Sequence, residues 1–467
     1  MKIEQIYTGC LAQGAYFISS EGEAAVIDPL RESKPYLERA EKEKVKIKYV
    51  FETHFHADFV SGHVDLAEKT GATIIYGPGA ETGFKSHTAK DEEEFFIGKL
   101  TIRVLHTPGH TPESSTYLLM DENGRPHCIF SGDTLFIGDV GRPDLAVKSD
   151  LTQEQLAGML YDSLRNKIMP LPDDVIVYPA HGAGSACGKN LSKETFDTLG
   201  NQKKTNYALA NISKEEFVKE LTTGILPPPQ YFPKNAILNK KGYSSFDNVV
   251  SHGKNALSPE QFEIIANENG ALVLDVRKPQ DFTEGHIPNS IFIGLDGQFA
   301  PWVGALIIDI NQPILLVAPE GREEETIMRL SRVGYDNTIG YLSGGVGAWK
   351  NSGRDLETVK SITADEFSND FKNKKVHVID VRKPGEYNSQ HLEGVENKPL
   401  DYLNDWISSV DKNATHYVHC AGGYRSMIAC SIMKSRGFGQ LIDVQGGFAA
   451  IQKTGLPTTE FICSSIK

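Results

Sequence analysis

The chain has 467 residues, of which 40% are hydrophobic and 23% are charged, and it carries a net charge of -13 at pH 7. A chain of this length exceeds what one hydrophobic core supports, so several domains are expected. The negative charge argues against nucleic acid or an anionic membrane surface as a partner. No apolar run approaches the roughly 20 residues that a membrane span requires, and no signal peptide is recognisable, so neither is expected.

The six cysteines lie far apart, without the regular spacing of a disulfide framework. This pattern predicts free thiols in a reducing compartment, and therefore a cytoplasmic protein. The six positions are Cys10, Cys128, Cys187, Cys420, Cys430 and Cys463.

The first predicted elements are strands at residues 15–19 and 24–28 and a charged helix at 36–44. An apolar, β-branched run at residues 47–51 predicts the next strand, and the apolar spacing from residue 63 onward predicts a second helix. The loop between that strand and that helix is unusually rich in side chains that bind metals.

Three candidate metal ligands fall within five residues of this loop, namely His54, His56 and Asp58. Imidazoles at positions i and i+2 of a strand end point the same way, so both can face one ion. A single histidine is more often a packed or solvated side chain than a ligand. The clustering at a strand exit is what favours a metal site here.

Three later strands also end in a histidine or an aspartate. The strand at 100–105 precedes a turn that carries His110, the strand at 128–130 leads to Asp133, and the strand at 175–178 leads to His181. Side chains that are distant in sequence but lie at strand exits can converge on one rim of a sheet. The sequence therefore predicts a metal site assembled from four strand ends.

The motifs THFHAD, TPGHT, SGD and PAHG, in that order, resemble the metallo-β-lactamase superfamily over residues 1–245. The resemblance implies an α/β fold of the αββα sandwich type, with the metal at one edge of two sheets. Hydrolytic members of that family carry HxHxDH and usually hold two metals. Here Phe59 stands in place of the last histidine, which argues against a two-zinc hydrolase of the glyoxalase II type.

The persulfide dioxygenases of the same superfamily resemble this chain more closely. That resemblance implies one Fe(II) per chain, with His54, His110 and Asp133 as its ligands. Two imidazoles and one carboxylate on one face leave three open positions, which can hold a thiolate sulfur and O2 side by side. The side chains expected to surround and orient these ligands are His56, Asp58 and His181.

Two further residues are candidate contacts of the substrate. Arg142, in the stretch GDVGRPDL, could meet an anionic part of the substrate, or it could form a surface ion pair. Cys187, in GSACG, could hold or relay sulfur, and this stretch resembles one found in dioxygenases fused to sulfurtransferase domains. The alternative for Cys187 is a small residue packed in a turn.

A proline-rich stretch at 224–233 precedes a domain boundary expected near residue 245. Beyond it, VLDVRKP at 273–279 recurs as VIDVRKP at 378–384. Each copy alternates strands and helices, which predicts two α/β domains with parallel sheets at 256–357 and 358–467. Both copies resemble the rhodanese family of sulfurtransferases.

In the second copy a strand at 417–419 ends at Cys420, and a helix follows the loop. Glycines in this loop permit a tight turn whose N–H groups point inward, an environment that favours a thiolate and a persulfide on Cys420. Arg425 supplies charge complementary to sulfite or thiosulfate. The first copy has Ala318 at the position of Cys420, so we expect it to be a spacer or docking module. Further loop residues predicted to contact the substrate are Ala421, Gly422, Gly423, Tyr424 and Ser426.

These features predict an enzyme of sulfide oxidation with two sites. Its substrates would be O2 and the persulfide of a small thiol, and Cys420 would exchange sulfur with sulfite or thiosulfate. The family also suggests a homodimer or homotetramer. One alternative is a glyoxalase II-like zinc thioester hydrolase with an accessory sulfurtransferase domain. Another is a sulfur carrier or redox sensor with an inactive metal site, which would show no oxygen uptake.

Overall fold

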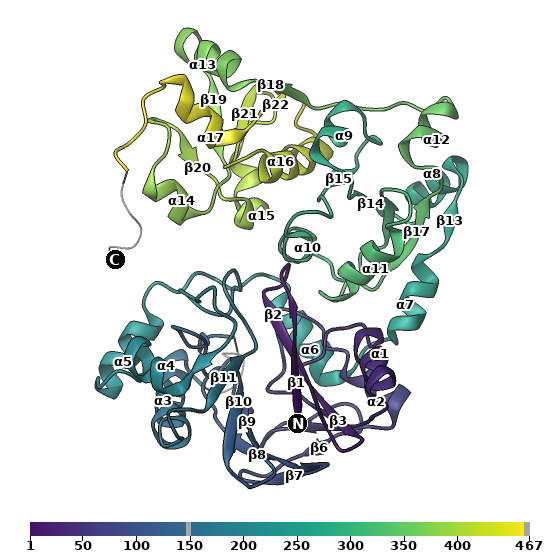
Figure 1. Cartoon of the computed structure of the whole chain (residues 1–467). Helices are drawn as coiled ribbons and strands as arrows, with labels where there is room; N and C mark the ends of the chain where they lie inside the picture. Colours follow the sequence, from purple (N-terminus) through teal and green to yellow (C-terminus); the bar gives the residue numbers. More distant parts are fainter. Residues whose placement is uncertain (146–150, 462–467) are drawn as a thin grey trace. The chain divides into compact units, whose positions relative to one another are not determined.

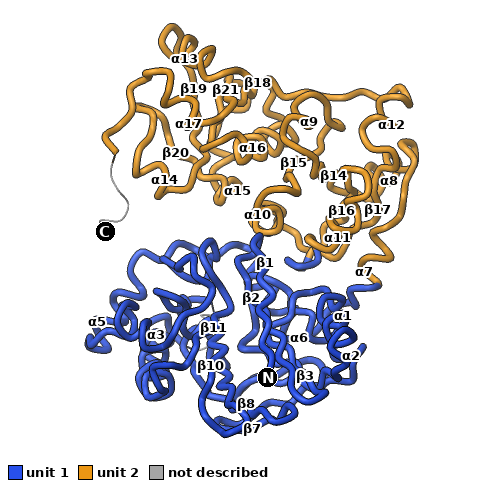
Figure 2. Tube along the Cα trace, in the orientation of Figure 1, with its two compact units in different colours: residues 1–247, 331–334 blue, residues 248–330, 335–467 orange. Residues whose placement is uncertain are grey.

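The structure is a computed structural model that describes residues 1–145 and 151–461, so Cys463 lies outside the described residues. The chain divides into two units (Figure 2). The first comprises residues 1–247 with 331–334, and the second comprises residues 248–330 with 335–467. This division lies close to the boundary expected near residue 245.

The first half of the first unit forms a six-stranded sheet (Figure 1). Its strands run in the order β1-β2-β3-β4-β5-β6, and helices α1 and α2 connect some of them. The predicted strands and the charged helix lie where the sequence placed them. The bounds are β1 Lys2–Thr8, β2 Gln13–Ser20, β3 Glu23–Ile27, α1 Lys34–Glu43, β4 Lys46–Phe51, α2 His63–Thr70, β5 Thr73–Tyr76 and β6 His87–Thr88.

A second six-stranded sheet runs in the order β12-β11-β10-β9-β8-β7. Helices α3 and α5 cover it, whereas α6 contacts residues of the first half, such as Ser61 and Gly83. The bounds are β7 Glu94–Ile97, β8 Leu100–His106, β9 Ser115–Met120, β10 Pro126–Gly132, α3 Gln153–Ser163, a π-helix Leu164–Ile168, β11 Ile176–Pro179, β12 Asp197–Thr198, α4 Leu199–Thr205, a 3-10 helix Tyr207–Leu209, α5 Lys214–Thr222, α6 Phe232–Lys241 and α7 Phe246–Gly253.

Strand β2 shows why these sheets stack as layers, because every one of its residues is buried. Tyr16 and Ile18 point into the core between the two sheets, whereas Ala15 and Phe17 point into the core under the helices on the other face. A strand that is apolar on both faces needs cover on both faces. The second sheet is covered in the same way by α3 and α5, so the αββα sandwich is confirmed.

The second unit contains two five-stranded parallel sheets, as the repeat predicts. The first sheet runs in the order β13-β17-β16-β14-β15. Its elements are β13 Ala256–Leu257, α8 Pro259–Glu268, β14 Leu272–Asp275, α9 Pro279–Glu284, β15 Ile291–Phe292, α10 Phe299–Leu306, β16 Ile314–Val317, α11 Glu323–Ser331, β17 Thr338–Leu342 and α12 Gly345–Asn351.

The second parallel sheet runs in the equivalent order β18-β22-β21-β19-β20. Two short 3-10 helices, Leu400–Tyr402 and Ile407–Ser409, lie between its regular elements, and a third, Gln452–Thr454, follows the last of them. Those elements are β18 Lys360–Ile362, α13 Ala364–Asn373, β19 His377–Asp380, α14 Pro384–Ser389, β20 Glu396–Asn397, α15 Leu403–Trp406, β21 His416–His419, α16 Tyr424–Ser435, β22 Leu441–Val444 and α17 Gly447–Ile451.

Residues that occur in both copies of the repeat make the same contacts in each copy. Arg277 bonds to the Asp275 carboxylate and to a backbone carbonyl, and Arg382 bonds to Asp380 and the equivalent carbonyl. These shared residues therefore hold the fold together, and chemistry specific to one copy must come from residues that the copies do not share.

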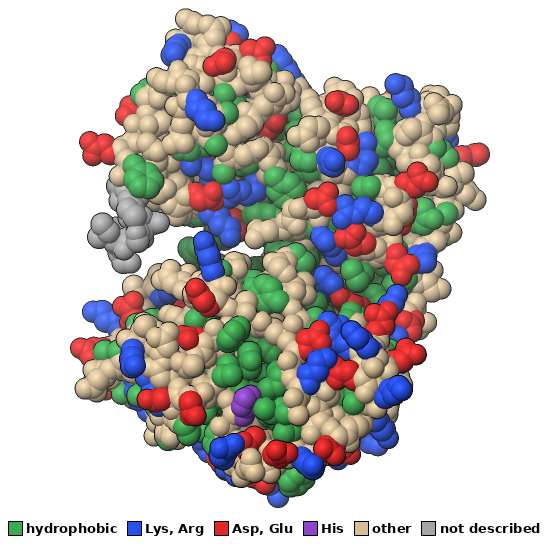
Figure 3. All heavy atoms as spheres, in the orientation of Figure 1, with side chains coloured by type: hydrophobic (Ala, Val, Ile, Leu, Met, Phe, Trp, Pro, Cys, Tyr) green, Lys and Arg blue, Asp and Glu red, His purple; other side chains and the backbone are tan. Residues whose placement is uncertain are grey.

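Among the described residues, no helix is long and apolar enough to cross a membrane. Acidic and basic side chains are both spread over the face shown in Figure 3.

Candidate functional site

The loop at residues 52–62 connects β4 to α2. Thr53 fixes the orientation of the first histidine in this loop, His54. Thr53 donates its backbone N–H and its hydroxyl to the carboxylate of Asp28, at 2.8 and 2.9 Å. Because the hydroxyl proton goes to Asp28, the Thr53 oxygen accepts from Nδ1 of His54, 3.0 Å away. The neutral His54 ring then carries its lone pair on Nε2.

His110 and His181 are held in the same way by backbone carbonyls. Nδ1 of His110 lies 2.8 Å from the carbonyl oxygen of Arg142, and Nδ1 of His181 lies 3.3 Å from that of Ala12. A carbonyl can only accept, so each Nδ1 donates and each neutral ring presents a lone pair on Nε2. This is how protein groups orient histidines that bind metals.

The three Nε2 atoms converge on Asp133, at the end of β10. Its carboxylate oxygens lie 3.9 Å from His54, 3.4 Å from His110 and 3.5 Å from His181. Among the described residues, neither carboxylate oxygen has a hydrogen-bond partner, although Asp133 is only 2% exposed. A buried carboxylate that faces nitrogen lone pairs is unfavourable without a cation. The donor set therefore fits a bound metal ion.

His54, His110 and Asp133 form the group predicted as metal ligands, and their ligand atoms all lie within 4.8 Å of one another. Burial, and then the positive forms of the neighbouring imidazoles, hold the pKa of His54 well below its usual range. A neutral imidazole is the form that binds a metal. Two imidazoles and one carboxylate are a donor set that suits a transition metal.

Two glycines let the loops approach this centre closely. A Cβ on Gly132, whose φ is +53°, would lie 2.6 Å from the Thr53 side chain. A Cβ on Gly141 would lie 2.2 Å from the carbonyl oxygen of Asp133, which accepts a hydrogen bond from the Gly141 N–H. Both positions therefore require glycine for steric reasons.

His56, the second histidine of the loop, is engaged by two acids that the sequence analysis did not identify. Its Nε2 lies 3.0 Å from Asp28 and 3.5 Å from Glu52. Burial lowers the pKa of His56, but Asp28 and Glu52 more than offset this, and the pKa rises to about 9. In the metal-free protein these two acids therefore favour the protonated form of His56. In the sequence, only the position of Glu52, between a buried strand and the first histidine of the loop, could have indicated that it lies at this site.

Cys187 lies at the same centre. Its side chain is buried, and its sulfur lies within 4.8 Å of the ligand atoms of Asp133 and His181. Burial, followed by the charges of Asp58 and Asp133, raises the pKa of the Cys187 thiol well above its usual range.

Arg142 holds the loop of Cys187 in place. Its N–H donates to the carbonyl of Cys187 at 3.0 Å, and its guanidinium donates to the carbonyl of Ala186. The same guanidinium forms two hydrogen bonds with Asp144, at 2.6 and 2.7 Å, and another with the carbonyl of Leu226. The positive charge of Arg142 is thus paired with the Asp144 carboxylate of the same protein. A contact between Arg142 and a substrate stays a prediction.

The second candidate site is the loop that follows β21. The backbone N–H of Gly423 donates to the sulfur of Cys420 at 3.1 Å, and Gly423 has a φ of +108°. The carbonyl of Cys420 accepts from Phe448 N–H at 2.7 Å, and a Cβ on Gly447 would lie 2.4 Å from that carbonyl. The loop therefore directs a backbone N–H group at the sulfur of Cys420, and this favours the thiolate form of the cysteine.

Arg425, at the start of α16, is bound to an acid that the sequence analysis missed. Its two terminal nitrogens lie 2.5 and 2.8 Å from the carboxylate oxygens of Glu386 in α14. Burial raises the pKa of Glu386, but the bonds and charge of Arg425 outweigh this and lower it. An anionic substrate would have to share Arg425 with Glu386.

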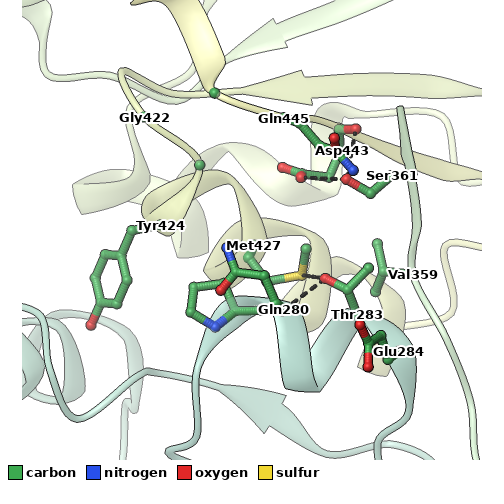
Figure 4. Close-up of a pocket in the computed structure, with 13 residues that line it drawn as sticks. Gln280, Thr283, Glu284, Val359, Ser361, Gly422, Tyr424, Met427, Asp443 and Gln445 are labelled. Carbon is green, nitrogen blue, oxygen red and sulfur yellow. Dashed lines mark hydrogen bonds between the residues drawn. The ribbon is translucent and has the colours of Figure 1, made fainter. Parts of the chain in front are cut away.

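Tyr424 joins this loop to the first copy of the repeat. Its hydroxyl donates to the carbonyl of Gly294 at 2.7 Å, and a Cβ on Gly297 would lie 2.3 Å from its ring. A pocket of about 720 Å³ lies beside the loop, between Gly422, Gly423 and residues of α9 such as Gln280 and Thr283 (Figure 4). The first copy, which has Ala318 in place of a cysteine, therefore forms one wall next to the Cys420 loop.

Comparisons with known proteins match each part of the chain separately. Residues 8–181 match the model of the metallo-beta-lactamase superfamily, and residues 258–352 and 363–454 each match the rhodanese-like domain. A crystal structure of a metallo-beta-lactamase from Staphylococcus aureus is 32% identical, with a TM-score of 0.65. The match covers 73% of this chain and 98% of that one.

Two kinds of curated relatives are about equally similar. The chain is 31% identical to the mitochondrial persulfide dioxygenase ETHE1 of Homo sapiens, over 44% of this chain and 74% of that protein. It is also 31% identical to the probable hydroxyacylglutathione hydrolase glo2 of Schizosaccharomyces pombe, over 34% of this chain. In that case the chain spans 58% of the relative's length.

Proposed function

Because the chain belongs to the metallo-beta-lactamase superfamily and continues into two rhodanese-like domains, we propose that it is an iron-dependent persulfide dioxygenase joined to a sulfurtransferase. In the first reaction, a persulfide RSSH, O2 and water give the thiol RSH, sulfite and two protons. In the second, a persulfide on Cys420 passes its outer sulfur to sulfite, which yields thiosulfate and the Cys420 thiolate. The rhodanese step also runs in reverse.

The convergence of His54, His110 and Asp133 is the observation that carries this proposal. One Fe(II) held by these three side chains would supply the reaction with O2 at its open positions. The protein's own contribution is orientation: Thr53 and the Arg142 carbonyl fix the two imidazoles, and burial keeps bulk water out.

The Cys420 loop supports the sulfur-transfer step. The Gly423 N–H donates to the sulfur, which favours a persulfide anion on Cys420. Arg425 lies at the start of α16, directly after the loop, and would bind an incoming oxyanion while sharing its charge with Glu386. Ala421, Gly422 and Ser426 are the other nearby residues that we expect to contact the substrate. Placing both sites on one chain raises the effective concentration of sulfite near its acceptor.

A zinc thioester hydrolase of the glyoxalase II type remains the second candidate, because the hydroxyacylglutathione hydrolases are equally similar in sequence. Phe59 argues against it, because it stands in place of the last histidine of the HxHxDH motif that hydrolytic members carry.

Metal content measured together with oxygen uptake separates the candidates. We expect one iron per chain and O2 consumption with at least one persulfide of a small panel that includes those of glutathione, coenzyme A and cysteine. Two zinc ions per chain, with thioester hydrolysis and no oxygen uptake, would overturn the proposal. Iron without oxygen uptake would instead favour a sulfur carrier. A cytoplasmic location and a homodimer or homotetramer stay predictions.

A further inference from the structure

The loop at residues 52–62, here called the metal loop, is mostly buried although it lies outside the regular helices and strands of the first unit. The backbone of such a loop cannot pair with itself in a regular pattern, so its buried N–H and C=O groups need partners from elsewhere in the protein. Two residues from much later in the chain, Asn239 and Arg332, supply partners for four of these groups.

Asn239, in helix α6, holds the middle of the metal loop. Its side-chain oxygen accepts from the N–H of Ser61 at 2.9 Å, and its side-chain nitrogen donates to the carbonyls of His56 and Phe59, each at 2.7 Å. Asn239 is only 1% exposed, so water does not compete for these bonds. One amide therefore fixes the backbone of the loop on both sides of Asp58.

Arg332 joins the metal loop to a neighbouring segment. Its carbonyl accepts from the N–H of Val60 at 2.7 Å. Its guanidinium donates two hydrogen bonds to the buried carboxylate of Glu32, with Nε 3.1 Å from one oxygen. Glu32 lies shortly after Asp28, whose carboxylate accepts from Thr53. Arg332 thus connects the loop to the segment that helps to orient its first histidine.

Both residues lie outside residues 8–181, the part of the chain that matches the metallo-beta-lactamase superfamily. Asn239 follows the proline-rich stretch. Arg332 belongs to segment 331–334, which is part of the first unit (Figure 2) although it follows α11 and precedes β17 in the chain. These two elements belong to the copy of the repeat that lacks a cysteine. The metal loop is therefore held by residues that come after the region shared with the superfamily.

We propose that Asn239 and Arg332 are positioning residues of the metal centre. They bind neither the ion nor the substrate, but they fix the loop that carries His54, so that Nε2 of this histidine stays directed at Asp133. The copy of the repeat without a cysteine thereby takes part in the first reaction, because its chain supplies Arg332. The link to oxygen uptake rests on the proposed dioxygenase function.

The first test uses Co²⁺ as the probe and does not depend on activity. Full-length protein is stripped of metal and titrated with Co²⁺ in competition with a chelator of known affinity. Asn239→Leu keeps the size of the side chain but removes its hydrogen bonds. We expect the Co²⁺ affinity to fall by about tenfold or more, and the visible absorption of bound Co²⁺, which reports the geometry of its ligands, to change.

Asn235→Leu is the matched control for this variant. Asn235 lies one turn earlier in α6 and is fully buried, and within the described part of the chain neither atom of its side-chain amide has a hydrogen-bond partner. The control should keep the affinity and the absorption of the natural protein. A folded Asn239→Leu protein that also keeps both would show that α6 does not position the metal loop. If Asn239→Leu does not fold, Asn239→Ser is judged by the same criteria.

The second test uses the pair of Arg332 and Glu32. Removing one partner leaves a buried charge unpaired, so Arg332→Gln should lower the Co²⁺ affinity by about tenfold. Adding Glu32→Gln restores a neutral, hydrogen-bonded pair and should recover most of the affinity. Arg354→Gln, which breaks a pair with Glu263 in the same copy, should have no effect. A loss that Glu32→Gln does not recover, or no loss at all, would contradict the role of Arg332.

Oxygen uptake by the iron-loaded protein gives a separate readout. Asn239→Leu and Arg332→Gln should lower kcat by about tenfold with little change in the KM for the persulfide, because both residues act on the loop. Sulfur transfer at Cys420 should stay unchanged. A change confined to KM would contradict positioning. A protein that follows the Co²⁺ predictions but takes up no oxygen in any form would refute only the proposed dioxygenase function.

Discussion

At the metal centre, each of three imidazoles donates one ring N–H to a fixed protein oxygen and directs its other nitrogen at Asp133. Thr53 differs from the two carbonyls in this role, because its oxygen accepts from His54 only while its proton is bonded to Asp28. The orientation of His54 therefore depends on a hydrogen-bonded chain that passes through a side chain and can be changed by mutation.

Substituting Thr53 by valine should weaken iron binding by about 10–100-fold, because it removes the acceptor that fixes the tautomer of His54. Thr53→Ser keeps the hydroxyl and should bind iron like the natural protein. Competition with a chelator of known affinity measures the difference. Equal iron affinity in Thr53→Val and Thr53→Ser would show that the chain from Asp28 to His54 does not support the metal.

His56 should make the stability of the metal-free protein depend on pH. Its pKa in the folded protein is about 9, compared with about 6.5 in an unfolded chain. A raised pKa stabilises the fold fully below about pH 6.5, and this contribution is lost as the pH rises through about 9. His56→Gln should thus lower the free energy of unfolding more at pH 6 than at pH 9.5, by up to about 3 kcal/mol.

Urea denaturation of the metal-free protein at several pH values measures this effect. His87→Gln, which removes an imidazole that is exposed beside Glu93, serves as the control. A difference between the natural protein and His56→Gln that stays constant from pH 6 to pH 9.5 would mean that Asp28 and Glu52 do not hold His56 in its charged form.

At the scale of elements, helix α16 follows the Cys420 loop and packs against the first copy of the repeat. Ser431, on this helix, accepts a hydrogen bond from the backbone N–H of Phe292 in β15, and Tyr424, its first residue, bonds to Gly294. The copy without a cysteine thus positions the loop of the copy that has one. This is a more specific role than the spacer or docking module expected from the sequence.

Gly297→Ala tests this positioning, because the added Cβ would lie 2.3 Å from the Tyr424 ring. We expect the kcat of thiosulfate sulfurtransfer to fall by about tenfold or more, while oxygen uptake with a persulfide stays unchanged. Gly347→Ala, in the same copy, has nothing within 4 Å of the added Cβ and serves as the matched control. Unchanged sulfur transfer in Gly297→Ala would remove the argument for positioning through Tyr424.

At the scale of the whole molecule, two sites on one chain should divide the reaction into separable halves. Cys420→Ser should leave oxygen uptake intact but make sulfite accumulate in place of thiosulfate, because no thiol remains to carry the sulfur. His110→Ala should do the reverse, with oxygen uptake and iron lost and sulfur transfer kept. Ion chromatography of the products, together with an oxygen electrode, measures both. Thiosulfate as the main product of Cys420→Ser would exclude the assigned role of the loop.

Much of this architecture can be predicted from sequence because it depends on local pattern. Apolar runs that end in His54, His110, Asp133 and His181 predict strands whose ends meet at one edge. The recurrence of VLDVRKP predicts two copies of one parallel-sheet domain, and the comparison of Cys420 with Ala318 predicts which copy carries a nucleophile.

The tertiary structure decided which partner each side chain takes. Asp28 and Glu52 engage His56, Glu386 engages Arg425, and Gly294 accepts from Tyr424. Most of these partners are far apart in sequence, and a carboxylate or a glycine in a loop carries no local pattern that identifies its partner. Strand ends and repeats follow from the order of residues along the chain, whereas such pairs depend on how the packed layers bring loops together.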